Sequence, residues 1–362
     1  MSDRIYLDHA STTPILPSAA EAIARGCAIW ANPSSAHAEG RAVRAEMEEA
    51  RRRIAAALGW DGSLIFTSGA TEALDIVLRR AKAGPRLVSA IEHAAVLRSA
   101  PDARRIAVDA QGRLDLADLE AALAGTERAL VAVQAVNNET GIIHPIERVA
   151  GIVREAGGLL LVDCAQSAGK LPLPQADFLV VAAHKLGGPP GAGALLVRDP
   201  ATLAAVGGQE EGQRPGTPSV PLILGFAAAL EADHGWYEQA KSLRARLDAA
   251  VEAAGGEVIA RDAPRIATIA AYRLPGVPAA AQMMQLDLAG IAVSAGSACS
   301  SGSLKTSHVL LAMGMAEDAA REVIRVSFGP PTTEAEVDRL IAEWRKLAER
   351  RRAPRPGSAQ AA

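Results

Sequence analysis

Cysteine is scarce in this chain of 362 residues, which has only three: Cys27, Cys164 and Cys299. They stand far apart, with no C-x-x-C pair and no histidine at the spacing of metal ligands, so neither a disulfide framework nor a zinc site is expected. Cys27 lies in a helix-like stretch and Cys164 at the end of an apolar run, where small apolar side chains fill core space. Cys299 instead lies in SAGSACSSGSLKTSH, whose Gly, Ser and Ala predict an exposed, mobile loop.

The sequence also has no marked excess of positive or negative charge and no long apolar run. Lys and Arg number 38 against 41 Asp and Glu, a net charge of -3, so the chain has no general attraction to nucleic acid or acidic membranes. No apolar run reaches the ~20 residues that cross a bilayer, and the N-terminal MSDRIYLDHASTTP has no basic segment followed by an apolar core. We therefore expect a soluble, cytoplasmic protein that binds neither nucleic acid nor membranes.

Alternating apolar and helical segments fill the first half of the chain. The apolar runs SLIFTS, RLVSAI, ALVAVQAV, GLLLVD, DFLVVAA and GALLVR predict strands. Helices are expected at 18–30, 40–58, 72–81, 115–124 and 146–156. Such alternation is typical of βαβ units around a mostly parallel sheet that is buried on both faces. The fold class is therefore α/β.

The pattern changes after residue 207. GGQEEGQRPGTPSVP predicts a long surface loop of the functional kind, and residues 222–254 are rich in helix signals. The runs RIATIAAYRL, GIAVSA and VIRVSF predict a second set of strands. At roughly 150 residues per domain the length predicts two or three domains. We expect a large domain over 14–250, a smaller α/β domain over 1–13 and 251–350, and a disordered tail over 351–362.

Two apolar runs between residues 159 and 193 each end in a charged residue, Asp163 after the first and Lys185 after the second. An aldehyde cofactor needs a lysine amine to form a Schiff base, and a carboxylate against its pyridinium nitrogen keeps the ring an electron sink. The pairing therefore points to a pyridoxal phosphate site. Taken alone, the two residues are equally compatible with an ordinary buried Asp and a loop Lys, because strand ends gather polar groups in any α/β site.

The segment FTSGATE, from Phe66 to Glu72, follows a predicted strand and opens a predicted helix. Backbone N–H groups and the helix dipole converge at such a turn, which suits a phosphate, and Ala70 and Thr71 would form the cup. The turn matches neither G-x-G-x-x-G nor G-x-x-x-x-G-K-[ST], and alone it could be an ordinary connection. Together with the Schiff-base lysine Lys185 and the ring-nitrogen acid Asp163, this phosphate cup would complete the three groups that a phosphorylated aldehyde cofactor needs.

Ten short motifs follow one another along nearly the whole chain. They are IYLDHASTTP from Ile5, NPSSAHAEGR from Asn32, FTSGATE from Phe66, EHAAVL from Glu92, VNNETG from Val136, VDCAQSAGK from Val162, AHKLGGPPGAGAL from Ala183, GGQEEGQRPGT from Gly207, SAGSACSSGSL from Ser294 and IRVSFG from Ile324. Ten ordered motifs are far more specific than one. In this order they resemble the cysteine desulfurases, in the class V aminotransferase group of fold type I pyridoxal phosphate enzymes.

The resemblance implies a fold and a set of cofactor contacts. The fold would be a large domain with a mostly parallel seven-stranded sheet and a smaller C-terminal α/β domain. Lys185 would carry pyridoxal phosphate, and Asp163 would pair with its ring nitrogen. Gln166 and Asn138 would hold the edge with the ring hydroxyl, and His93 would stack on the ring and move protons.

The resemblance also implies how the phosphate is held. Ala70, Thr71 and His184 would bind it, helped by Thr217, which in this family reaches across from the other subunit of a homodimer. Ala182 stands where the family usually has a serine that bonds to the phosphate. Losing that bond would cost about 1.5 to 3 kcal/mol if nothing replaces it. Further departures from the family pattern are His9, Asp75, Pro190, Glu211 and Ser219.

The implied reaction converts L-cysteine to L-alanine. Arg325 would grip the substrate carboxylate with its two-pronged guanidinium, and Asn32 would help to bind the substrate. Lys185 would act as the base at the substrate α-carbon. Cys299 would attack the substrate sulfur and keep it as a persulfide, for delivery to a sulfur-acceptor or scaffold protein.

Two other functions stay open at this point. One is a related pyridoxal phosphate lyase or transaminase, such as a selenocysteine lyase, in which Cys299 is dispensable. The other is a catalytically weakened dimer that serves as a scaffold in sulfur transfer, which the changes at Ala182 and Glu211 would favour.

Overall fold

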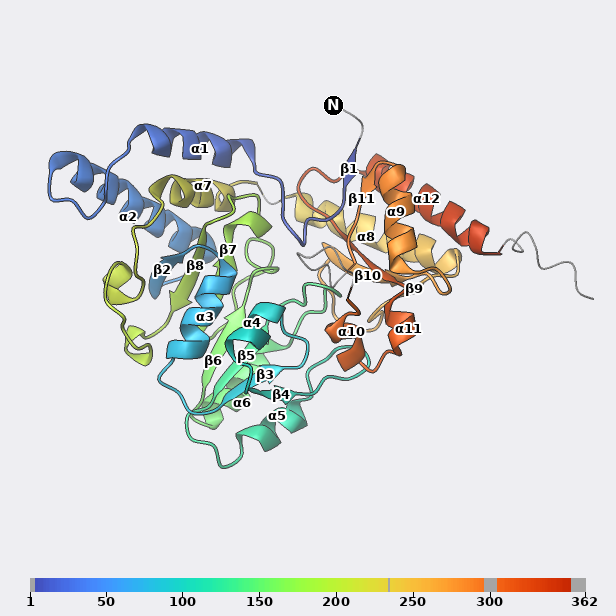
Figure 1. Ribbon diagram of the computed structural model, residues 1–362, viewed down its shortest axis with the longest axis horizontal. Helices are drawn as coiled ribbons and strands as arrows, with labels where there is room; N and C mark the ends of the chain where they lie inside the picture. The colour runs from blue at the N-terminus through green and yellow to red at the C-terminus, as the bar shows by residue number, and fades with distance from the viewer. Residues whose placement is uncertain (1–3, 234, 296–304, 353–362) are drawn as a thin grey trace, which may run out of the picture.

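The computed structural model describes residues 4–233, 235–295 and 305–352, whose elements form two groups joined side by side (Figure 1). Seven strands of the described chain form one sheet in the order β2-β8-β7-β6-β5-β3-β4. They are β2 (Ser63–Thr67), β3 (Arg86–Ser89), β4 (Arg104–Ile106), β5 (Leu130–Gln134), β6 (Leu159–Asp163), β7 (Phe178–Ala182) and β8 (Gly193–Val197). Only β8 runs against its two neighbours within this sheet, which makes the sheet mostly parallel as expected.

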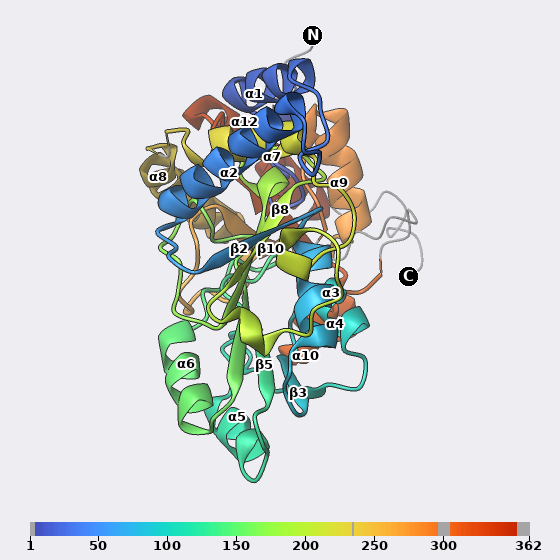
Figure 2. The ribbon, with the colours of Figure 1, turned by 90° about the vertical axis from the view of Figure 1, so that its left-hand side faces the viewer.

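Helices cover both faces of this sheet (Figure 2). One face packs against α1 (Pro17–Ala28), α2 (Ala38–Leu58), α5 (Leu116–Leu123), α6 (Ile146–Glu155) and α7 (Val220–Leu230). The other face packs against α3 (Ala70–Arg80) and α4 (Ala94–Ser99). Side chains alternate along each strand, so Leu64 and Phe66 lie in the first core and Ile65 lies in the second. Burial on both faces explains why the strands are continuous apolar runs.

The second group is built on an antiparallel sheet of order β12-β10-β9. Its strands are β9 (Glu257–Val258), β10 (Ile269–Arg273) and β12 (Val323–Ser327), and nearby β1 (Ile5–Tyr6) pairs in parallel with β11 (Ile291–Ala292). The helices are α8 (Trp236–Ala253), α9 (Ala279–Leu288), α10 (His308–Ala312), α11 (Glu317–Ala320) and α12 (Glu334–Arg352). The N-terminal segment thus joins the C-terminal part of the chain.

The packing of α8 bears on the predicted division of the chain. Leu243, Leu247 and Val251 of α8 lie in the core of the second group, with Tyr272 and Trp344. The division into a large domain over 14–250 and a smaller one over 1–13 and 251–350 stays a prediction. From its packing we propose that α8 belongs to the smaller domain. Residues 351 and 352, predicted to start the tail, are helical, and the rest of the tail lies outside the described residues.

Most of the predicted elements are present, with shifted ends. The region 222–254 contains two helices, α7 and α8, and α7 begins at Val220 inside the predicted surface loop. That loop also contains the short 3-10 helix Glu210–Gly212. Another short 3-10 helix, Pro200–Thr202, lies before the loop and follows β8. In the described ranges, no helix is both long and apolar enough to cross a membrane.

Candidate functional site

A cavity of about 500 Å³ opens where β5 and β6 end and α3 begins. Neighbouring parallel strands end at the same edge of a sheet, which is where α/β proteins bind ligands. Nine of the predicted site residues line this one cavity: Ala70, Thr71, His93, Asn138, Asp163, Gln166, His184, Lys185 and Arg325.

Lys185 lies at the end of a 3-10 turn, Ala183–Lys185, directly after β7. Its Nζ donates to the carbonyl oxygens of Ala10 at 2.6 Å and Ser11 at 2.7 Å. Burial, helped by the charge of Arg325, lowers the pKa of Lys185 to about 8. About a tenth of this amine is therefore uncharged and nucleophilic at pH 7, far more than for an exposed lysine.

Asp163 is the last residue of β6 and is almost fully buried. Its Oδ1 accepts a hydrogen bond from the Ala165 amide at 2.9 Å. Burial raises the pKa of Asp163, while that hydrogen bond and the charge of Lys185 act in the opposite direction. An acid in this position gains from a cationic partner in the cavity, such as a protonated ring nitrogen.

The first turn of α3 forms one end of the cavity together with His184. Gly69 precedes the helix with φ of 147°, and the amides of Ala70 and Thr71 start it. Burial lowers the pKa of His184 to about 4, and its Nδ1 lies 3.2 Å from Thr12 Oγ1. Unpaired amides at a helix start and a nearby neutral imidazole are suited to bind a phosphate.

His93 stands at the start of α4, where its Nδ1 accepts a hydrogen bond from the Ala95 amide at 3.2 Å. That bond assigns the ring proton to Nε2. Burial, and then the charge of Lys185, lowers the pKa of His93 to about 4, so the ring is neutral at pH 7.

Gln166 reaches the cavity from the turn after β6. Its Nε2 donates to the Ala10 carbonyl at 2.9 Å, the same oxygen that accepts from Lys185. Its Oε1 is buried and has no hydrogen-bond partner in the described part of the chain. A buried acceptor without a partner is costly, so a donor from a bound group would be favoured there.

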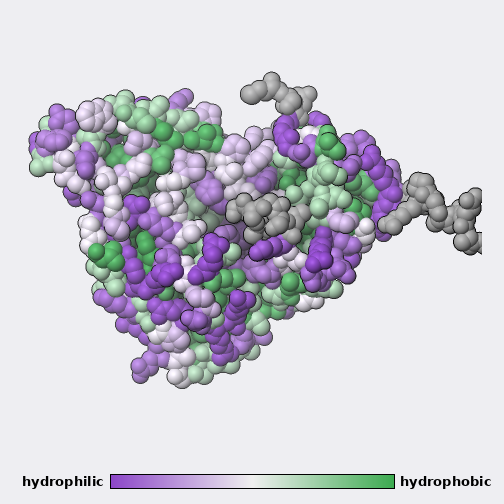
Figure 3. All heavy atoms as spheres, viewed as in Figure 1, coloured by the Kyte–Doolittle hydropathy of each residue, from purple (hydrophilic) through white to green (hydrophobic). Residues whose placement is uncertain are grey.

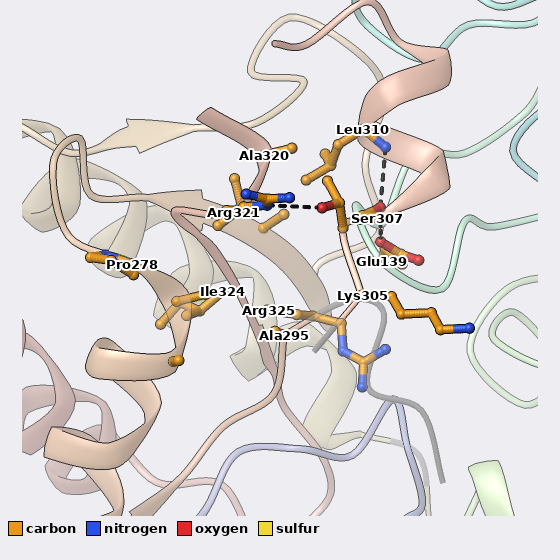
Figure 4. A pocket seen from close by; sticks show the side chains of 15 residues that line it. Glu139, Pro278, Ala295, Lys305, Ser307, Leu310, Ala320, Arg321, Ile324 and Arg325 are labelled. Carbon is orange, nitrogen blue, oxygen red and sulfur yellow. Dashed lines mark hydrogen bonds between the residues drawn. The ribbon is translucent and has the colours of Figure 1, made fainter. Parts of the chain in front are cut away.

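Arg325 lies in β12, and its guanidinium enters the cavity from the smaller unit. It donates through Nη1 to the Asn138 carbonyl at 2.9 Å and through Nη2 to Asp8 Oδ1 at 2.8 Å and Ser11 Oγ at 2.6 Å. Beside it is a smaller, mostly apolar pocket of about 180 Å³, where Glu139 accepts a hydrogen bond from Ser307 (Figure 4). Arg325 therefore connects the two units at the cavity.

Three predicted site residues do not line the cavity. Asn32 and Thr217 are exposed on the surface, and Cys299 lies outside the described residues. The segment of Asn32 contacts the start of the loop that leads to Thr217, because Ser34 Oγ donates to Gln209 Oε1 at 2.9 Å. Within one chain, neither residue therefore reaches the candidate site.

Comparison with known proteins adds sequence evidence to this geometry. The aminotransferase class-V family matches residues 5–340. A cysteine desulfurase of Cereibacter sphaeroides is 35% identical over 387 aligned residues, covering 99% of each chain, and an IscS-like cysteine desulfurase of Mycobacterium tuberculosis is 38% identical, covering 93% of this chain and 94% of the relative. The chain belongs to the cysteine desulfurase family.

The solved structure of a NifS-like protein from Rickettsia africae has the same fold, with a TM-score of 0.87 and 30% sequence identity. The match covers 96% of this chain and 99% of the other. The architecture is therefore that of fold type I, as the motifs indicated. Enzymes of the class V group generally depend on pyridoxal phosphate. The polar groups of the cavity fit that cofactor, and the unpaired acceptor Gln166 Oε1 is among them.

One departure from the pattern of the desulfurase family has a visible effect on packing. His9 is buried, and neither ring nitrogen has a partner in the described residues. A Cβ atom added to Gly329 would lie 2.0 Å from His9 Nδ1, so this imidazole fits only against a glycine. Burial lowers the pKa of His9 to about 4, which keeps the ring neutral.

The other departures lie in different surroundings. Ala182 is buried at the end of β7, Pro190 lines the cavity, and Glu211 is exposed. Asp75 Oδ1 accepts from Arg79 at 2.6 Å and from Ser99 at 2.8 Å, which joins α3 to α4. Nothing in the structure explains Ser219.

Sequence reasoning missed several polar residues of the cavity wall: Ser11, Ser68, Gln134 and Ser294. Ser11 stands inside the motif IYLDHASTTP, which was used for the resemblance but given no role. Its contact with Arg325 joins positions 314 residues apart, and no local pattern reveals such a pair.

Proposed function

We propose that this protein is a pyridoxal phosphate-dependent cysteine desulfurase, which converts L-cysteine to L-alanine and transfers the sulfur to Cys299. The observation that carries the proposal is that Lys185, Asp163 and Arg325 face one cavity, next to the start of α3. An amine, a buried acid, a guanidinium and a phosphate-binding turn are the four groups that an amino acid and this cofactor require together.

Pyridoxal phosphate, when bound, supplies an aldehyde that takes up an amine and a ring that withdraws electrons from the substrate α-carbon. The α3 turn and His184 would hold its phosphate, Asp163 its ring nitrogen, and Gln166 and Asn138 its hydroxyl edge. Thr217 would contribute from a second subunit.

Lys185 and His93 would move the protons of the reaction. With its pKa lowered to about 8, Lys185 has the free amine needed to remove the α-proton of the substrate. His93 is neutral and carries its proton on Nε2, so as a proton carrier it would first accept a proton and then give that proton up. The carboxylate of the substrate would lie on Arg325.

Cys299 would complete the reaction as the nucleophile. Its thiolate attacks the sulfur of the substrate, and an S–S bond forms while the C–S bond of the substrate breaks. The electron pair stays on the substrate β-carbon, which takes up a proton, so cysteine plus thiol gives alanine plus persulfide without an external oxidant. A sulfur-acceptor or scaffold protein would then remove the outer sulfur.

The test is incubation of the pyridoxal phosphate-loaded protein with L-cysteine, followed by mass spectrometry and assay of alanine. We expect one added sulfur on the peptide that contains Cys299, and loss of both the adduct and sulfide release in Cys299→Ala. Cys27→Ala, which removes an exposed thiol of α1, is the matched control and should keep the Cys299 adduct.

Other outcomes would point to the alternatives. Full activity of Cys299→Ala, with another amino acid preferred to cysteine, would indicate a lyase or transaminase instead. A colourless protein that cannot be reconstituted with the cofactor, and that shows no covalent labelling of Lys185 after borohydride reduction, would indicate a scaffold.

A further inference from the structure

The hydrogen bonds of Arg325 place a carboxylate of the protein itself where a substrate carboxylate is expected. Figure 4 shows the side chain extending away from Ile324 and Pro278, out of the smaller pocket. Its Nη2 contacts Asp8 Oδ1 at 2.8 Å and Ser11 Oγ at 2.6 Å, and Ser11 Oγ in turn donates to Asp8 Oδ1 at 2.9 Å.

The number of donors on the guanidinium makes this arrangement restrictive. A guanidinium has five N–H donors, one on Nε and two on each terminal nitrogen, in a fixed plane. Two-pronged contact with a carboxylate uses either Nη1 with Nη2 or Nε with Nη2, so both modes require Nη2. Nη2 already donates to both Asp8 and Ser11. A substrate carboxylate bound in either mode therefore competes with these two acceptors for Nη2.

Two further observations show that this exchange is feasible. The Nε atom of Arg325 is buried and has no partner in the described residues, so a carboxylate that spans Nε and Nη2 would satisfy a donor that is now unpaired. The Asp8 side chain is 20% exposed against 5% for Arg325, so a displaced Asp8 carboxylate can be hydrated while the guanidinium stays in place.

We propose that Asp8 competes with the substrate for Arg325: its carboxylate occupies the guanidinium until a free carboxylate on the amino acid displaces it. The proposal rests on the proposed function, because it takes Arg325 as the site of the substrate carboxylate. Amino acids whose carboxyl group is an amide or ester cannot displace Asp8, and they leave Arg325 in its present contacts. Asp8 thus lowers the affinity for ligands with a free carboxylate, which must displace it, and leaves the affinity for amides and esters unchanged.

The turn that carries Asp8 also connects the substrate to the catalytic amine. The carbonyl oxygens of Ala10 and Ser11 accept the two hydrogen bonds of Lys185 Nζ. Exchange at Arg325 therefore takes place on the same four-residue turn, residues 8–11, that accepts the hydrogen bonds of Lys185.

The experiment is calorimetric titration of the cofactor-loaded wild type, Asp8→Asn and Ser11→Ala with L-alanine and with L-alaninamide. Asp8→Asn replaces a charged acceptor by a neutral one, so L-alanine should bind about 5-fold more tightly, while binding of L-alaninamide should not change. Ser11→Ala removes a neutral acceptor, and its effect should have the same sign and be smaller. Thermal melting of each variant checks that the fold is kept. If Asp8→Asn does not fold, the titrations of Ser11→Ala alone test the proposal.

Unchanged or weaker binding of L-alanine in the folded variants would overturn the proposal, because Asp8 would then only hold Arg325 in position. An equal gain for L-alanine and L-alaninamide would overturn it as well. Formation of alanine from cysteine by the wild type is measured separately, so a wild type that forms no alanine refutes the proposed function and not the competition at Arg325.

Discussion

Among single residues, Lys185 has two short hydrogen bonds and a pKa that its surroundings shift strongly. Its amine is buried between two carbonyl oxygens and near Arg325, and its pKa is lowered to about 8. The protonated form is disfavoured by burial, so the amine loses its proton at lower pH than an exposed lysine does.

We predict that Lys185 in the protein without cofactor reacts with formaldehyde and borohydride half-maximally near pH 8, as measured by peptide mass spectrometry. Exposed Lys241 is the internal control, because its hydrogen bond to Glu238 raises its pKa and delays its reaction to higher pH. Reaction of both lysines over one pH range would contradict the burial of Lys185.

The sequence predicted those site residues that stand directly after strands or at helix starts. Asp163 and Lys185 follow apolar runs, and strand direction alone brings such ends together. Asp8 was not predicted, because its partner Arg325 is 317 residues away and lies on a strand of the other unit. Asn32 and Thr217 were predicted as site residues from the family resemblance alone. In the fold of one chain, neither lines the cavity.

At the level of elements, β8 packs closely against the α3 turn, the end of the cavity where we propose that the phosphate binds. A Cβ atom added to Gly193, the first residue of β8, would lie 2.7 Å from both Gly69 Cα and the Val181 carbonyl oxygen. Both neighbours are backbone atoms, so they cannot move aside by changing a rotamer.

We predict that Gly193→Ala lowers the free energy of unfolding by about 2 kcal/mol and weakens retention of pyridoxal phosphate. Denaturant unfolding and cofactor absorbance after dialysis measure the two effects. Gly151→Ala in α6 is the matched control, because its Cβ would meet no atom within 4 Å, and it should be neutral or slightly stabilising. Equal effects of the two variants would argue against close packing at Gly193.

The elements themselves were predicted where their periodicity was strong. The buried strands of the large sheet were recognised because continuous apolar runs of this length are typical of parallel strands. β4, of sequence RRI, was missed because two of its three residues are exposed. The break between α7 and α8 was missed too, because both flanks of residues 231–235 have helical periodicity.

For the whole molecule, the surface around the end of α1 is the strongest sign of a second subunit. Trp30, which follows α1, is 83% exposed, and its neighbour Ile29 is also exposed. On the face in Figure 3, hydrophobic side chains gather in the region where Figure 1 places α1 and α7. Burial of such side chains between two copies would explain their exposure in one chain.

We predict that the protein is a homodimer and that Trp30→Glu makes it monomeric at micromolar concentration, as measured by analytical ultracentrifugation. A charge in an apolar interface without a partner is costly. Leu288→Glu is the control, because Leu288 is 77% exposed at the end of α9 in the other unit, and it should leave the dimer intact. A dimeric Trp30→Glu protein would remove Trp30 from the interface.

The position of the N-terminal segment has a consequence for biosynthesis. β1 pairs with residues 291 and 292, and the Ala10 amide donates to Ser327, so two of the anchors of the turn that holds Lys185 come from the last part of the chain to be translated. At roughly 5 to 20 residues per second, the ribosome releases these anchors tens of seconds after it has made the turn. A nascent chain that stops before residue 327 can complete the large sheet and still has an unfinished catalytic centre.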